Sequence, residues 1–94
     1  MGRFLFVLFV PLIVGCALNP PRVEMTHAEL TLQAAIEAGA ERWAPELVQK
    51  AKDQFRLAEG AMRERLYSDA RKHAKEALQF AEQAEEKAIL QGAP

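Results

Sequence analysis

Residues 68–91 read SDARKHAKEALQFAEQAEEKAILQ, and the alanines of this stretch decide the fold. Six of them recur at steps of four, three, four, three and four residues: Ala70, Ala74, Ala77, Ala81, Ala84 and Ala88. That spacing is a strict heptad seam, which predicts one helix with a narrow face of methyl groups. Small side chains let a partner helix approach to near the lower end of the usual separation of about 8–10 Å. We therefore expect a helix from the cap residue Ser68 to about Gln91, stopped by Gly92.

A second apolar stripe lies upstream and supplies a partner for this seam. Pro45 suits a first helical position, and Trp43 and Val48 have the spacing of a hydrophobic staple around the N-cap Ala44. The stripe continues at helical spacing towards Leu66, through Leu47, Ala51, Phe55, Ala58 and Met62. The two faces predict an antiparallel helical hairpin with its turn near Tyr67. Since neither glycine nor proline marks that turn, one long helix over residues 45–91 is the alternative.

A shorter helix is predicted ahead of the hairpin. Thr26 and Glu29 match a capping box, and apolar residues then recur at steps of three and four until the helix ends between Gly39 and Arg42. The preceding segment contains Asn19-Pro20-Pro21-Arg22, and its prolines predict an extended stretch over residues 18–23. The expected organisation is all-α, with a tether over residues 16–25 and a helical domain over residues 26–92.

The first fifteen residues have the pattern of a cleavable signal peptide. Arg3 gives a basic start, and an apolar run from Phe4 to Val14 follows, interrupted by Pro11. This run is shorter than the about 20 apolar residues that a spanning helix needs, which disfavours a retained transmembrane anchor. The chain holds a single cysteine, Cys16, which therefore cannot form an internal disulfide.

The segment Ile13-Val14-Gly15-Cys16 resembles the lipobox of bacterial lipoproteins. The resemblance implies acylation of Cys16, with chains such as palmitate, and cleavage after Gly15. Cys16 then becomes the new N-terminus. Several buried acyl chains make a stable membrane anchor, whereas a single chain binds only marginally. Ala17 stands where an aspartate would imply retention in the inner membrane. The resemblance therefore implies an outer-membrane lipoprotein that faces the periplasm.

Two further resemblances cover the helical part. The spacing of Tyr67, Ala70, Ala74, Ala77 and Leu78 is similar to the second half of a tetratricopeptide repeat, although the repeat's glycine would fall at Arg65. A closer resemblance covers about Leu32 to Leu90 and is carried by three segments: Ala34-Ala35-Ile36, Trp43-Ala44-Pro45-Glu46-Leu47 and Tyr67-Ser68-Asp69-Ala70. With these segments the chain resembles an envelope lipoprotein family, the domain of unknown function four-three-nine-eight. That resemblance implies a lipoprotein signal followed by an alanine-rich helical domain, and no established activity.

No pattern of catalytic residues or metal ligands is found in the sequence. The only serine, Ser68, is better explained as a cap, and lipid would block Cys16. His27 and His73 belong to different predicted helices, are expected to face solvent, and lack the Glu-x-x-His order of a di-iron site. Removal of Arg3 from the 12 basic side chains leaves 11 against 13 acidic ones, which gives no general attraction to nucleic acid. We therefore expect no catalytic site, no cofactor and no nucleic-acid partner.

The charge distribution suggests where a partner could bind. Arg63, Arg65, Arg71 and Lys72, together with Lys75, surround the predicted turn, whereas Glu82, Glu85 and Glu86 lie near the far end of the last helix. A solvated surface is the plain interpretation. The sharper hypothesis is that the basic tip binds an acidic partner, such as anionic peptidoglycan groups or an acidic protein patch, with Trp43 as a further contact residue.

Together these observations predict a non-catalytic structural or scaffolding module held in the envelope membrane by lipid. A core made of alanine buries little area per residue, so self-association or an envelope partner would stabilise it. The alternative is an adaptor, similar to a pilotin, that binds one envelope protein in a helical groove.

Overall fold

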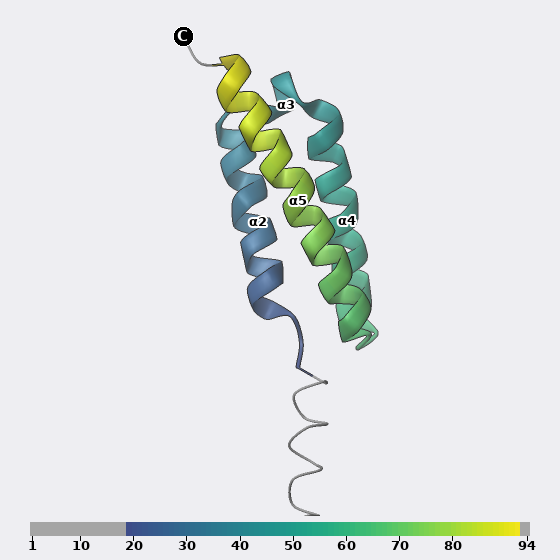
Figure 1. Ribbon diagram of the computed structural model, residues 1–94. Helices are drawn as coiled ribbons and strands as arrows, with labels where there is room; N and C mark the ends of the chain where they lie inside the picture. Colours follow the sequence, from purple (N-terminus) through teal and green to yellow (C-terminus); the bar gives the residue numbers. More distant parts are fainter. Residues whose placement is uncertain (1–18, 93–94) are drawn as a thin grey trace, which may run out of the picture.

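The computed structural model describes residues 19–92, and this part of the chain is entirely helical, with no strand. The four helices are α2 (Arg22–Glu37), α3 (Ala40–Trp43), α4 (Pro45–Arg63) and α5 (Tyr67–Gly92). Figure 1 shows that α5 lies beside both α2 and α4, parallel to the first and antiparallel to the second. The predicted all-α class is confirmed. The pairing of α5 with α2 was not expected, because the sequence suggested α4 as the only partner of the seam.

The turn between α4 and α5 excludes the single long helix. Arg65 adopts a left-handed conformation, with φ at 61°. Its N–H donates to the Met62 carbonyl at 3.1 Å, and the Leu66 N–H donates to the Ala61 carbonyl at 2.8 Å. These two bonds form a Schellman motif, which closes α4 by satisfying its last carbonyls. An arginine thus occupies the position that glycine usually takes, so no glycine marks the turn in the sequence.

The N-terminal boundary corrects the sequence prediction. Helix α2 begins at Arg22 rather than Thr26, so residues 22–25 are helical and not part of an extended tether. Pro21 is its N-cap and is buried, and its carbonyl accepts the Met25 N–H at 3.0 Å. Prolines fit this position because the first N–H groups of a helix have no intrahelical partner anyway. The Thr26–Glu29 pair therefore lies inside α2 and does not cap it.

A short helix that the sequence did not predict reverses the chain between α2 and α4. Helix α2 ends at Glu37, and Gly39 takes a φ of 96°, a conformation that suits glycine because it has no Cβ. The four residues of α3 follow at once, and Ala44 then caps α4 without a side-chain hydrogen bond, as expected for alanine. Gly39 thus ends α2 and begins the reversal of the chain into α4, which runs antiparallel to α5.

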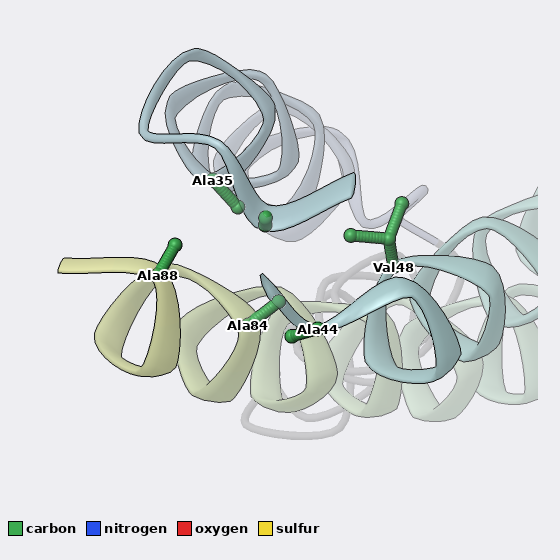
Figure 2. Close-up of a cluster of buried hydrophobic side chains, with 6 residues drawn as sticks. Ala35, Ala44, Val48, Ala84 and Ala88 are labelled. Carbon is green, nitrogen blue, oxygen red and sulfur yellow. The ribbon is translucent and has the colours of Figure 1, made fainter. Parts of the chain in front are cut away.

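The core is built from the predicted alanine seam. All six seam alanines of α5 are buried, each with no more than 2% of its surface exposed. At the end of the bundle beside α3, the packing includes side chains from every helix (Figure 2). This cluster consists of Ala35, Ala40, Ala44, Val48, Ala84 and Ala88. Because nearly all its members are alanine, the helix backbones can approach closely.

Candidate functional site

The predicted signal cleavage and lipidation residues, Ile13, Val14, Gly15 and Cys16, lie outside the described residues. The described chain starts at Asn19, three residues after Cys16. We therefore consider first the end of the bundle at which the chain enters, and call it the proximal end. It comprises residues 19–27, at the start of α2, and residues 60–75, which contain the α4–α5 turn and the first part of α5 (Figure 1).

Four predicted contact residues meet at the proximal end. Arg63 and Arg65 belong to the α4–α5 turn region and are exposed, and Lys72 is exposed on the second turn of α5. Arg71 is only partly exposed. Its Nη2 donates to the Asn19 carbonyl at 3.2 Å, and its Nε lies 3.6 Å from Glu24 Oε1. Arg71 thus holds the entering chain and the first turn of α2 against α5.

The proximal end gains one basic residue that sequence reasoning missed. Arg22 is exposed at the first position of α2, and the contacts of Arg71 with Asn19 and Glu24 bring that position beside α5. The sequence placed Arg22 in a tether, so its position relative to the turn was undefined. Only the packing of α2 along α5 adds Arg22 to the basic group.

Trp43 lies at the opposite, distal end, beside the last turn of α5. Its indole ring packs close to two glycines: a Cβ built on Gly39 would lie 3.5 Å from Trp43 Cδ1, and one on Gly92 would lie 3.2 Å from Nε1. The Arg42 guanidinium lies over the ring, 5.1 Å from its centroid. Trp43 packs against the alanine cluster as well. The structure thus places Trp43 at the other end of the bundle from the four basic residues, packed against residues of its own chain.

The two ends carry opposite charge. Residues 19–27 and 60–75, which form the proximal end, hold six basic and three acidic side chains. Residues 34–46 and 82–92, at the distal end, hold two basic and six acidic ones. Most of this charge stays exposed, since the ion pairs that the described residues form at these ends are Arg71–Glu24 and Lys52–Glu41, the latter at 3.8 Å. The bundle is therefore an electric dipole along its length.

The histidines occupy different environments, which corrects one expectation. His27 is exposed, as predicted, but His73 is partly buried between helices. Its Nδ1 donates to Gln54 Oε1 at 2.8 Å, so it links α5 to α4. Over residues 19–92, no group of three His, Cys, Asp or Glu side chains could hold a metal ion. In the same part of the chain, none of the helices is both long and apolar enough to cross a membrane.

Some large apolar side chains remain on the surface of the bundle. On the outer side of α2, Val23 is 79% exposed and Leu30 is 59% exposed, and both line a shallow depression together with Arg22, Thr26 and His27. Leu57, Leu66, Ile89 and Leu90 are exposed elsewhere. Two of these exposed apolar residues lie next to the basic ones: Val23 follows Arg22 at the start of α2, and Leu66 follows Arg65 at the α4–α5 turn.

Comparison with known proteins identifies the domain. A family model described as Domain of unknown function (DUF4398) matches residues 23–93. The match extends at both ends beyond the segment of about Leu32 to Leu90 that carries the resemblance. No curated protein and no solved structure matches the chain. Because the family model covers most of the sequence, the chain belongs to the DUF4398 family.

Proposed function

We propose that this member of the DUF4398 family is a lipid-anchored lipoprotein of the cell envelope whose helical bundle acts as a non-catalytic structural or scaffolding module. The anchor would be formed at Cys16 after cleavage of residues 1–15 at the lipobox Ile13-Val14-Gly15. With Ala17 after the cysteine, the location would be the outer membrane, with the bundle in the periplasm. The α4–α5 pair would be its tetratricopeptide-like unit.

The observation that carries this proposal is the short connection between Cys16 and the folded bundle. The Asn19 carbonyl already accepts a hydrogen bond from Arg71, and the Pro21 side chain is buried. Three peptide units separate Cys16 from Asn19, and they span at most about 11 Å. A lipid on Cys16 would thus hold a rigid bundle close to the membrane rather than release it on a long flexible linker. Close, fixed placement suits a structural module.

An adaptor role is a second candidate, and one observation favours it. The exposed Val23 and Leu30 give α2 an apolar outer side, of the kind that packs against an amphipathic helix of another protein. In that case the depression along α2 would receive one segment of an envelope protein client. A structural module would instead contact its own copies or the wall.

The lipid anchor is tested by mass spectrometry of the N-terminal peptide of the protein purified from bacterial membranes. We expect a peptide that begins at Cys16 and carries the mass of a diacylglyceryl group, with or without a further acyl chain. The matched control is Cys16→Ser, which should stay unprocessed and leave the membrane fraction. An unmodified Cys16, or a mature chain that begins elsewhere, would overturn the proposal.

The structural and adaptor roles are separated by photocrosslinking in the native envelope. A photoreactive residue replaces Leu30 on α2 in one protein and the exposed Glu59 on α4 in another. Adducts with copies of the chain or with the sacculus support the structural role. One dominant protein adduct that forms from position 30 and not from position 59 supports the adaptor role instead.

A further inference from the structure

A group of exposed basic residues lies at the end of the bundle from which the chain continues towards Cys16. Arg22 starts α2, while Arg63 and Arg65 lie at the α4–α5 turn, and Arg71 joins the two regions through Glu24 and Asn19. Asn19 is at most about 11 Å from Cys16 in any conformation of the chain. If Cys16 carries lipid, this distance is close to the Debye length of about 8 Å at physiological ionic strength. The connection is therefore short enough for the proximal charges to come within the distance over which charges at the membrane surface act.

We propose that the proximal end is a membrane contact surface, on which Arg22, Arg63, Arg65 and Lys72 bind the phosphate groups of anionic lipids around the anchor. All four side chains are exposed and free to reach the headgroups. Arg71 is held by Glu24 and Asn19, so it positions the surface rather than contributing a free charge. This inference rests on the lipid anchor of the proposed function. It adds an orientation, with the bundle standing on the membrane by its basic end.

The charge at the distal end supports the same orientation. The six acidic side chains there would be repelled by an anionic leaflet. The 26 residues of α5 span about 39 Å at 1.5 Å per residue, which carries the acidic end well beyond the screening distance. In an upright bundle, the basic end therefore lies against the anionic membrane surface that attracts it, and the acidic end lies far from the surface that repels it.

Lipid fits the basic end better than the peptidoglycan or acidic protein patch suggested by the sequence alone. A short connection to a lipidated Cys16 would turn this end towards the membrane and away from the wall. Val23 adds a further feature of membrane surfaces, because its aliphatic side chain is 79% exposed beside Arg22 at the start of α2. Basic groups that flank an exposed aliphatic residue favour the interface between headgroups and acyl chains.

The test measures the height of each end above the membrane by energy transfer. The mature lipoprotein is reconstituted in vesicles of phosphatidylcholine alone or mixed with phosphatidylglycerol, each with an acceptor dye on a fraction of the headgroups. A donor dye is attached to a new cysteine, at Ser68→Cys near the proximal end or Gln91→Cys near the distal end, both exposed positions. The acylated Cys16 does not react, so labelling is specific. We expect phosphatidylglycerol to raise transfer from position 68 and lower it from position 91, and high salt to cancel both changes.

The charge variant removes Arg63, Arg65 and Lys72 together by substitution with glutamine. Each lost charge should lower the ratio of docked to undocked protein about fivefold. In vesicles with phosphatidylglycerol, the variant should therefore show the energy transfer that the parent protein shows in phosphatidylcholine alone. The matched control carries Arg42→Gln and Lys87→Gln at the distal end and should behave like the parent protein. Circular dichroism checks that each variant keeps its helices.

Each outcome decides between the proposals. The membrane contact is overturned, and the anchor stays intact, if the energy transfer of the lipidated protein does not change with phosphatidylglycerol. The same conclusion follows if the triple variant shows the same energy transfer as the parent protein. Mass spectra without lipid on Cys16 overturn the anchor and, with it, the membrane contact. Binding of purified sacculi that is lost in the triple variant, without any effect of phosphatidylglycerol, assigns the basic end to the wall and overturns the inference.

Discussion

Both ends of the bundle contain buried alanines of α5, but the interactions around these alanines differ between the two ends. At the distal end, carbon packs on carbon: the alanine cluster with Val48 is buried, and Trp43 lies against Gly39 and Gly92. At the proximal end, the contacts that join α2 to α5 include an ion pair and a hydrogen bond, both made by Arg71. Burial of one methyl group contributes about 0.8 kcal/mol, whereas a partly exposed ion pair contributes about 0–1 kcal/mol.

This difference suggests a division of roles between the two ends. The distal end tolerates little change, since any added atom meets a close-packed neighbour. The proximal end can lose or gain charged side chains at small cost to stability, so its surface is free to serve binding. Four substitutions test this division, in order of decreasing effect.

Ala84→Leu should destabilise the bundle most. Ala84 is fully buried in the distal cluster, so the larger side chain must push helices apart, which costs about 2–3 kcal/mol of unfolding free energy. Urea unfolding followed by circular dichroism measures the loss. Gln83→Leu places the same side chain on the exposed side of α5 and should change stability by less than about 0.5 kcal/mol. Equal effects of the two substitutions would contradict a close-packed distal end.

Trp43→Ala should cost about 2 kcal/mol of unfolding free energy, roughly half the loss for a fully buried aromatic residue, because the ring is half-buried. The same unfolding measurement checks it. Arg42→Ala removes only the cation that lies over the ring and should cost about 0.5 kcal/mol. If Trp43→Ala left stability unchanged but abolished binding to an envelope component, Trp43 would be a contact residue as the sequence suggested.

Arg71→Ala should cost about 1 kcal/mol, because it removes both the ion pair with Glu24 and the bond to the Asn19 carbonyl. Part of this cost should disappear at high salt, which screens the ion pair. The neighbouring Lys72→Ala, an exposed side chain, should have no measurable effect on unfolding. A loss as large as that of Ala84→Leu would show that the proximal end is as tightly coupled as the distal one.

Arg65→Gly should have the smallest effect and the opposite sign. The left-handed φ of 61° costs a non-glycine residue about 1–2 kcal/mol, and glycine removes this cost. Part of the gain is offset because glycine loses more conformational entropy on folding. We expect a gain of about 0.5 kcal/mol in unfolding free energy. Arg65→Ala is the control, since it removes the same charge and keeps the strain. The glycine variant should thus be more stable than the alanine variant while both lose the same charge at the proximal end.

The sequence determined the parts that depend on local spacing. The heptad of alanines in α5 predicted both its helix and its buried face, because small residues at that period form one continuous seam. Pro45 marked the start of α4, since proline is favoured at the first helical position. The clustering of Arg63, Arg65, Arg71 and Lys72 followed from a turn between two predicted helices. The lipobox at Cys16 also depends on local order alone, and it stays a prediction.

The tertiary structure decided what depends on contacts between distant segments. The left-handed turn at Arg65 could not be predicted from an arginine, because only the packing of α4 on α5 compensates the strain of that position. Helix α2 starts at Arg22 because Pro21 is buried and the carbonyl of Asn19, two residues before it, is bound by Arg71, which lies 52 residues after Asn19. That contact also brings Arg22 to the basic end and leaves Trp43 at the other. The local sequence pattern thus predicted the helices and their buried faces. Contacts across the bundle decided which residues lie together at its basic end and at its acidic end.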